Sequence, residues 1–117
     1  MRHKVQSKRV NRDEAHLDSM LRNMATSIIL YEKVKTTKAK AKILKPIIEK
    51  LMVDAKGSSA VNVYRHLNSY LLDKNASKKV VDELLKRYKD RKAGFVRITN
   101  LGYRAGDAAP MVQIELV

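Results

Sequence analysis

Apolar residues recur at helical spacing in the first part of the chain. The side chains that share one helical face are Met20, Leu21, Met24 and Ile28. Asn11 is a good N-cap, and Glu14 lies three residues later, where it would complete a capping box. The pattern therefore predicts a first helix over residues 12–31.

The hydrophobic period changes to two after this helix. The segment KVKTT at residues 33–37 alternates as a strand with one buried face does. Thr37 can then cap a second helix that begins at Lys38, where lysines alternate with alanines. Gly57 is a natural residue to end this helix.

Two more helical patterns and two strand patterns follow. Ser59 and Ser77 are the expected caps of the third and fourth helices, which the polar segment 73–77 separates. The apolar stripes of these helices include Tyr64, Tyr70 and Tyr88, which we expect in the core. Residues 95–99 and 111–116 then alternate as strands. The element order α-β-α(3)-β(2) predicts an α+β fold.

The segment 101–110 is expected to be a functional loop between the last two strands. Gly102 and Gly106 would let the backbone bend around Tyr103 and Arg104, and we expect a positive φ at Gly106. Asp107 is expected to brace the loop by accepting backbone hydrogen bonds. Tyr103 could stack on a base or sugar, or it could pack against the protein, and the sequence leaves both interpretations open.

The charge balance points to a polyanionic partner. The chain of 117 residues has 25 Lys+Arg against 12 Asp+Glu, a net charge of +13. An anionic membrane surface is the weaker choice, because the longest strongly apolar run, residues 28–31, is far below the roughly 20 residues of a membrane span. The N-terminus lacks the apolar region of a signal peptide, and the absence of cysteine fits a reducing cytoplasm.

The basic residues gather in segments that could bind nucleic acid. We interpret residues 1–12 as a basic N-terminal arm and residues 13–117 as one globular domain. Further candidates lie on the polar side of the first helix, on the first strand, at the start of the second helix and around the last loop. The candidate nucleic-acid-binding residues are Arg2, His3, Lys4, Lys8, Arg9, Asn11, Arg12, Arg22, Asn23, Lys35, Thr36, Thr37, Lys38, Lys40, Lys42, Lys45, Arg97, Tyr103 and Arg104.

No set of residues in the sequence predicts catalysis. His3, His16 and His66 are scattered and form no metal-ligand pair. The glycines form no phosphate-binding loop. We therefore expect no catalytic residue, no metal and no cofactor.

The motifs and their order resemble a known family. MRH at the start, LRNMA at 21–25, KVKTT at 33–37 followed by KAK, LGYRAGDAAPM at 101–111 and IELV at 114–117 are similar to the seventeenth protein of the bacterial large ribosomal subunit (the bL17 family). The resemblance implies helices packed on one face of a small three-stranded mixed sheet. It also implies binding to large-subunit (23S) ribosomal RNA near the outer end of the peptide exit region, beside the protein bL32.

Two other classes of function are weighed against a structural ribosomal protein. A basic nucleoid or regulatory DNA-binding protein is the alternative, although no helix pair shows the short turn of a helix-turn-helix. An enzyme acting on RNA lacks residues for the chemistry. Association with large subunits that survives DNase would separate the first two classes.

Overall fold

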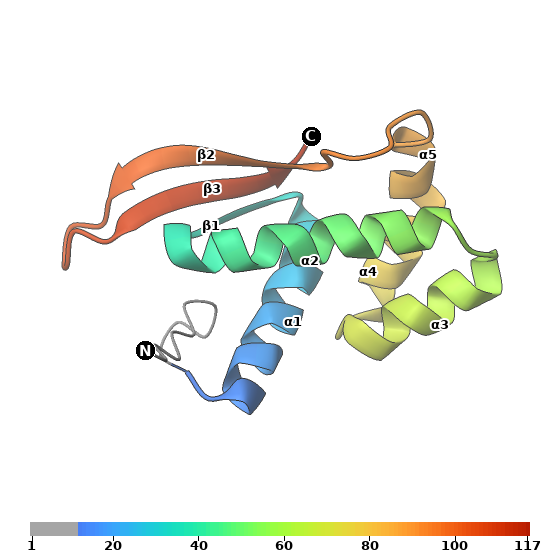
Figure 1. The fold of residues 1–117 in the computed structure, drawn as a ribbon, viewed down its shortest axis with the longest axis horizontal. Helices are drawn as coiled ribbons and strands as arrows, with labels where there is room; N and C mark the ends of the chain where they lie inside the picture. Colours follow the sequence, from blue (N-terminus) through green and yellow to red (C-terminus); the bar gives the residue numbers. More distant parts are fainter. Residues whose placement is uncertain (1–11) are drawn as a thin grey trace, which may run out of the picture.

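The computed structural model describes residues 12–117, and the predicted α+β order of elements is confirmed (Figure 1). The fourth helical region is divided into three parts, of which the middle one, η2, is π-helical. The elements in chain order are α1 (Glu14–Tyr31), β1 (Lys33–Thr37), α2 (Lys38–Lys56), α3 (Ala60–Tyr70), α4 (Lys74–Lys79), η2 (Val80–Leu84), α5 (Leu85–Arg87), β2 (Val96–Tyr103) and β3 (Pro110–Leu116).

The three strands form an antiparallel sheet in the order β1-β3-β2. The expectation of a mixed sheet is therefore wrong. A short connection joins β2 to β3, and such a hairpin makes neighbouring strands antiparallel. β1 runs in the same direction as β2, but β3 lies between them, so no parallel pair forms.

The helices cover one face of the sheet and leave the other face open (Figure 1). Val112, Ile114 and Leu116 of β3 are buried on the covered face, and Ile114 lies opposite Val34 on one side and Ile98 on the other. The alternate positions of the strands face outward. The cross-strand row Lys33–Glu115–Arg97 belongs to this outer face.

One core joins the helices to the sheet. Its completely buried side chains come from all parts of the fold and include Ile28, Leu44, Ile48, Leu67 and Ile114. The predicted core position of Tyr88 is confirmed, because this residue is only 3% exposed and its ring contacts Phe95 edge-on. Tyr64 and Tyr70 are half-buried.

Two helix caps differ from the sequence expectation. Asp13, not Asn11, caps α1, and its carboxylate accepts a hydrogen bond from the His16 backbone N–H at 2.9 Å. Asp73 caps α4 through the N–H of Asn75 at 2.8 Å, whereas the expected cap Ser77 is buried inside that helix. In both places an aspartate near the predicted cap satisfies the free N–H groups of the first turn.

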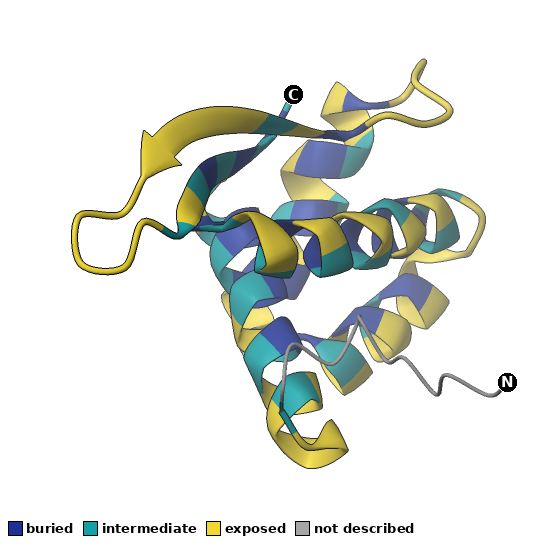
Figure 2. Ribbon diagram, turned by 60° about the vertical axis from the view of Figure 1, so that its left-hand side comes forward, coloured by how far each residue is buried: buried dark blue, intermediate teal, exposed yellow. Residues whose placement is uncertain are grey.

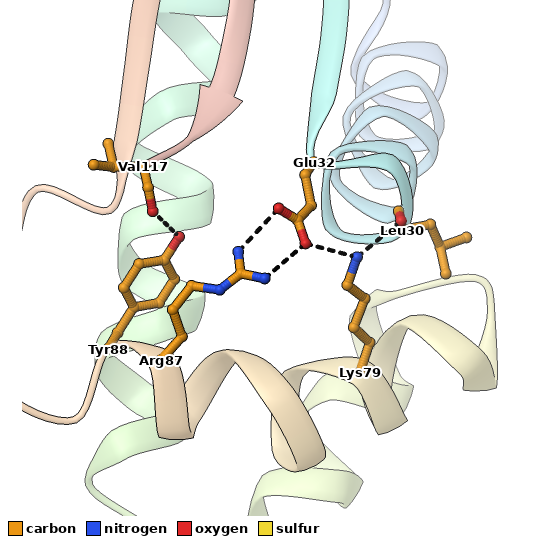
Figure 3. A network of polar contacts seen from close by, with 6 residues as sticks. All are labelled: Leu30, Glu32, Lys79, Arg87, Tyr88 and Val117. Carbon is orange, nitrogen blue, oxygen red and sulfur yellow. Dashed lines mark hydrogen bonds and ion pairs between the residues drawn. The ribbon is translucent and has the colours of Figure 1, made fainter.

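Glu32 forms the corner between α1 and β1 (Figure 3). Its φ of 64° is in the left-handed region, which a residue other than glycine adopts at a cost. The carboxylate accepts two hydrogen bonds of 2.9 Å from the Arg87 guanidinium. It also forms an ion pair with the Lys79 ammonium group at 3.0 Å. Lys79 also donates to the Leu30 carbonyl at 3.0 Å. The corner is therefore held by the fourth helical region.

The π-helical turn η2 lies between the two cations that reach Glu32. Eight positions separate Lys79 from Arg87, and in an uninterrupted α-helix this interval would rotate the second side chain by about 80° from the first. A π-turn accommodates one extra residue. With one residue taken up by the π-turn, Lys79 and Arg87 are placed as two residues seven positions apart in a regular α-helix would be. Such residues lie on nearly the same face. Both cations can therefore point to one carboxylate.

Charged residues also tie the far half of α2 to the rest of the fold. The Glu49 carboxylate accepts hydrogen bonds from the backbone N–H groups of Phe95 and Val96 at 3.2 and 3.1 Å. Lys56 donates to the carbonyls of Tyr88 and Arg91. These contacts orient α2 against the sheet, and within residues 12–117 the N-terminal half of α2 has no such ties.

Replacing Glu32 by glutamine should reduce stability in a pH-dependent way. Hydrogen bonds from Arg87 and then Lys79 lower the pKa of Glu32 from its usual 4.5 to about 2. The stability supplied by the ionised form is therefore complete above pH 4.5 and is lost as the pH falls toward about 2. We expect Glu32→Gln to cost about 1–2 kcal/mol at pH 7, and the difference from the parent to shrink below pH 4.5.

Urea unfolding between pH 2 and 7 would measure this difference. Glu83→Gln is the matched control, because Glu83 is exposed and makes no ion pair within residues 12–117. Equal losses in the two variants at pH 7 would contradict a role for the Glu32 corner.

Candidate nucleic-acid interface

A stripe of lysines lies along the first turns of α2. Lys38, Lys42 and Lys45 are exposed, and their spacing of four and three residues places them on one side of the helix. Lys40 lies on the opposite side and is half-buried. The structure therefore brings three of the four predicted lysines of this helix into one row.

An open groove of about 700 Å³ follows this stripe. Its apolar lining comes from α2 and from the first residue of β3. The lining residues are Lys38, Ala39, Lys42, Ile43, Pro46, Ile47 and Pro110. The groove is thus apolar along its length and carries ammonium groups at one side.

The β2–β3 hairpin extends beyond the helices, and Figure 2 shows its tip as exposed. The strands reach further than predicted, so the connecting loop is only residues 104–109. Tyr103, at the end of β2, is 79% exposed. Of the two interpretations of Tyr103, packing against the protein is therefore ruled out within residues 12–117. The ring is available to a partner.

Asp107 braces the hairpin loop as predicted. Its carboxylate accepts the backbone N–H of Ala109 at 3.2 Å and also pairs with the Arg104 guanidinium at 2.9 and 2.5 Å. The hydrogen bond from Arg104 is the main cause that lowers the pKa of Asp107 to about 2. Arg104 is therefore partly committed to the loop, although its side chain remains 53% exposed.

The glycines of the hairpin have different roles from those expected. Gly102 has a φ of 107° and lies at a register shift between β2 and β3, where the strand carries an extra residue. Gly106 is outside the positive-φ region, and a Cβ at this position would meet nothing within 4 Å. The expectation of a positive φ at Gly106 is wrong, because the turn places the left-handed residue at Ala108, with a φ of 54°.

The outer face of the sheet carries a third group of cations. Lys33 and Lys35 of β1 are exposed two residues apart, on the face that the helices leave open. Arg97 lies across the sheet from Lys33, and its guanidinium is 3.6 Å from the Glu115 carboxylate between them. One acid thus faces three cations in this part of the sheet.

Several predicted residues are engaged in the fold. Arg22 forms an ion pair with Asp18 at 2.9 Å, donates to the Ser69 carbonyl at 3.1 Å and lies over the Tyr70 ring. Asn23 donates to the Ser19 carbonyl one turn earlier. These contacts explain both side chains structurally, and contact with RNA stays a prediction for them.

Two threonines and one arginine complete the described candidates. Thr36 is buried on the face that the helices cover, and we leave it out of the interface proposed below. Thr37 occupies the N-cap position of α2, as predicted, without a side-chain hydrogen bond to the helix. Arg12 lies just before α1 and is half-buried. The candidates outside the described residues are Arg2, His3, Lys4, Lys8, Arg9 and Asn11.

Sequence reasoning missed Lys33, Asn100 and the apolar lining of the groove. Lys33 could have been found, because it alternates with the predicted Lys35 on one face of the same strand. Asn100 is exposed beside the register shift, which the sequence pattern does not reveal. The groove combines Pro110 with residues of α2, so its position depends on the packing of distant segments.

Residues 12–117 contain no group of three His, Cys, Asp or Glu side chains placed to hold a metal ion. The same part of the chain has no helix with the length and apolar character needed to cross a membrane. The assembled features are exposed lysines, an apolar groove and an exposed tyrosine at one end of a basic protein. They define the class of small basic proteins that bind nucleic acid.

Comparison with known proteins identifies the family. Residues 20–117 match the family described as ribosomal protein L17. The chain is 44% identical over its full length to the large ribosomal subunit protein bL17 of Rickettsia bellii, covering 82% of that protein. It is 42% identical over its full length to the bL17 protein of Neorickettsia sennetsu, which it covers completely. The chain therefore belongs to the ribosomal protein L17 family.

Family membership establishes the general function. The chain is a structural constituent of the large ribosomal subunit, acts in translation on the cytoplasmic ribosome and is not an enzyme. The resemblance found in the sequence motifs is confirmed. The alternative, a nucleoid or regulatory DNA-binding protein, is not supported.

Changing Lys38, Lys42 and Lys45 together to glutamine should weaken RNA binding and flatten its salt dependence. Each lost phosphate contact lowers the slope of log K against log salt by about 0.7–0.9, so we expect a decrease of about 2–3. Filter binding to large-subunit RNA at several salt concentrations would measure the slope. The matched control replaces the exposed lysines Lys74, Lys78 and Lys86 and removes the same charge from another part of the surface. An equal change of slope in both variants would mean that the stripe acts only through net charge.

Replacing glycines of the hairpin should distinguish Gly102 from Gly106. Gly102→Val should destabilise the protein by about 1–3 kcal/mol, because a β-branched residue is strained at a φ of 107°. Gly106→Val should change stability by only about 0.5 kcal/mol. Thermal unfolding of both variants would test this, and a larger loss for Gly106→Val would contradict the description of the turn.

Proposed function

We propose that a composite surface of this protein binds the large-subunit (23S) ribosomal RNA. The surface consists of the lysine stripe on α2, the hairpin tip and the outer face of the sheet. The observation that carries the proposal is the common placement of Lys38, Lys42 and the 79% exposed Tyr103 at one end of the molecule. Lysines would contact phosphates, which fixes the position of the protein without reading sequence.

The distribution of acids supports this proposal. Glu32, Glu49, Asp107 and Glu115 belong to elements that form or adjoin the proposed surface, and each is engaged by cations or N–H groups of the protein itself. Internal pairing of the acids leaves the positive field of the exposed lysines uncancelled. The basic arm of residues 1–12 would add phosphate contacts at the start of the globular domain 13–117.

We also propose that the protein contacts bL32 near the outer end of the peptide exit region, as the family resemblance implies. A surface suited to a protein lies at the junction of α2 and α3, where Val53 and Val61 are 49% and 61% exposed. Among the described residues, the hollow at this junction is lined by Asp54 and His66 and by no lysine or arginine. Such a surface is better suited to protein than to phosphate contact.

Subunit association and crosslinking would test these proposals. Tagged protein should sediment with large subunits after DNase treatment and should crosslink to 23S RNA from positions 38, 42 and 103. A photoreactive residue at position 61 should crosslink to bL32. RNA crosslinks from position 61 with none from positions 38, 42 and 103 would reverse the assignment of the two surfaces.

Arg104 and Asp107 offer a direct test of the hairpin. Arg104→Ala removes the cation and its pairing with Asp107 but leaves the Asp107 carboxylate in place to accept the Ala109 N–H, whereas Asp107→Ala removes both loop contacts and frees the cation. If Arg104 contacts RNA, only Arg104→Ala should lower incorporation into large subunits, and its stability should change by about 0.5 kcal/mol or less. Competition with the parent protein during subunit reconstitution would measure incorporation. If both variants lost incorporation equally, Arg104 would be a structural residue of the loop. If both were incorporated as well as the parent protein, Arg104 would not contact RNA.

A further inference from the structure

The groove beside α2 continues toward the hairpin. A second hollow, of about 190 Å³, shares Lys38 and Pro110 with the groove and is otherwise lined by Asn100, Gly102, Tyr103 and Met111. The two hollows therefore adjoin each other, and together we name them the α2–hairpin trough. It runs from Ile47 along α2 to the exposed ring of Tyr103.

Phosphate contacts alone do not account for this shape. Ammonium groups on any exposed helix can reach a phosphate, and an apolar floor adds nothing to that interaction. The floor of the trough is apolar over Ala39, Ile43, Pro46 and Ile47. A floor of this kind gains free energy when it covers an apolar surface and excludes water from it.

A nucleobase that has left its stack matches the trough in three respects. Its flat faces are apolar, as the floor is, and its phosphate would lie within reach of Lys38 and Lys42. Its polar edge needs hydrogen bonds, which the exposed Asn100 amide can both donate and accept. Asn100 makes no side-chain hydrogen bond within residues 12–117.

Backbone geometry keeps the hairpin end of the trough accessible. Gly102 has no side chain, and nothing lies within 4 Å of the position where its Cβ would be. The next residue, Tyr103, can therefore present its ring to a second base without crowding from Gly102. The volume of about 700 Å³ also falls in the range of roughly 300–1,000 Å³ that is usual for small-ligand sites.

We propose that the α2–hairpin trough binds an unstacked base of looped RNA and that Tyr103 stacks on a neighbouring base. This inference rests on the proposed RNA-binding function and adds the class of RNA. The preferred RNA has unpaired bases, since those of a continuous duplex stay inside the stack. An A-form duplex would contact only the lysines.

The experiment compares two RNAs and three variants of the full chain. The probes are an RNA hairpin with an unpaired purine-rich loop and a fully paired RNA duplex with the same number of phosphates. Ala39→Gln fills the trough from an exposed helical position without changing charge, and Tyr103→Ser removes the ring. Lys42→Gln removes one charge. Ala60→Gln is the control for a glutamine placed on another exposed helical position.

The parent protein should bind the looped RNA more tightly than the duplex. Ala39→Gln and Tyr103→Ser should each weaken binding of the looped RNA about 5- to 100-fold, as loss of a stacked base does, with no change in salt slope. Neither should affect the duplex. Lys42→Gln should lower the slope by about 0.7–0.9 with both RNAs. Ala60→Gln should bind as the parent does.

The outcomes separate this inference from the function on which it depends. Equal binding of loop and duplex by the parent, with a normal salt slope, would overturn the base site while leaving RNA binding intact. Normal RNA binding by Ala39→Gln together with poor incorporation into subunits would assign the trough to a protein side chain and would also overturn it. Failure of the parent to bind either RNA or 23S RNA would overturn the proposed function itself.

Discussion

The corner at Glu32 is the constraint on which the arrangement of the fold depends. The left-handed φ of 64° turns the chain from α1 directly into β1, without a glycine to relieve the strain. Hydrogen bonds from Arg87 and Lys79 to the carboxylate offset this cost. They also join the start of the sheet to the fourth helical region (Figure 3). The direction of β1, and so the outward position of Lys33 and Lys35, follows from this corner.

Charge is divided between two tasks in the molecule. Arg22, Lys56, Lys79 and Arg87 hold elements together through carboxylates, carbonyls and rings. The lysines at the start of α2 have no such contacts among the described residues, although they are equally basic. Net charge alone therefore overstates the number of cations available to RNA. The useful distinction is whether a cation has an internal partner, and only the folded structure supplies it.

The sequence predicted most of the elements because hydrophobic period determines them. Alternation at residues 33–37 and the helical stripes before and after it depend only on neighbours in the chain. Prediction failed where a nearby side chain competed for the same task, as Asp13 did with Asn11 and Asp73 with Ser77. The π-turn leaves no mark in the hydrophobic pattern, because one inserted residue is tolerated within the apolar stripe.

The candidate site was only partly predictable for a similar reason. The spacing of the lysines on α2 can be read from the sequence, and it correctly predicted the stripe of Lys38, Lys42 and Lys45. It did not predict that Lys40 lies on the opposite side of the helix. The pairing of Arg22 with Asp18, four residues away on the same helix, could also have been predicted from sequence spacing. The same holds for Arg104 and Asp107, which are three residues apart in the hairpin loop. The trough could not be predicted, because Pro110 and Ala39 come together only when β3 enters the sheet.

The position of β3 between β1 and β2 has a consequence for biosynthesis. The strand that both others need as a partner is made last, so neither β1 nor β2 can complete its backbone pairing until residues 110–116 have been synthesised. Until then the apolar faces of α1 and α2 have no sheet to cover them. The pairing of β1 with β3 joins segments that are far apart in the sequence, and pairing of this kind is a slow step in folding. Charged side chains on an unpaired edge oppose pairing with another chain, so the exposed Lys33 and Lys35 would protect the newborn protein from aggregation during that interval.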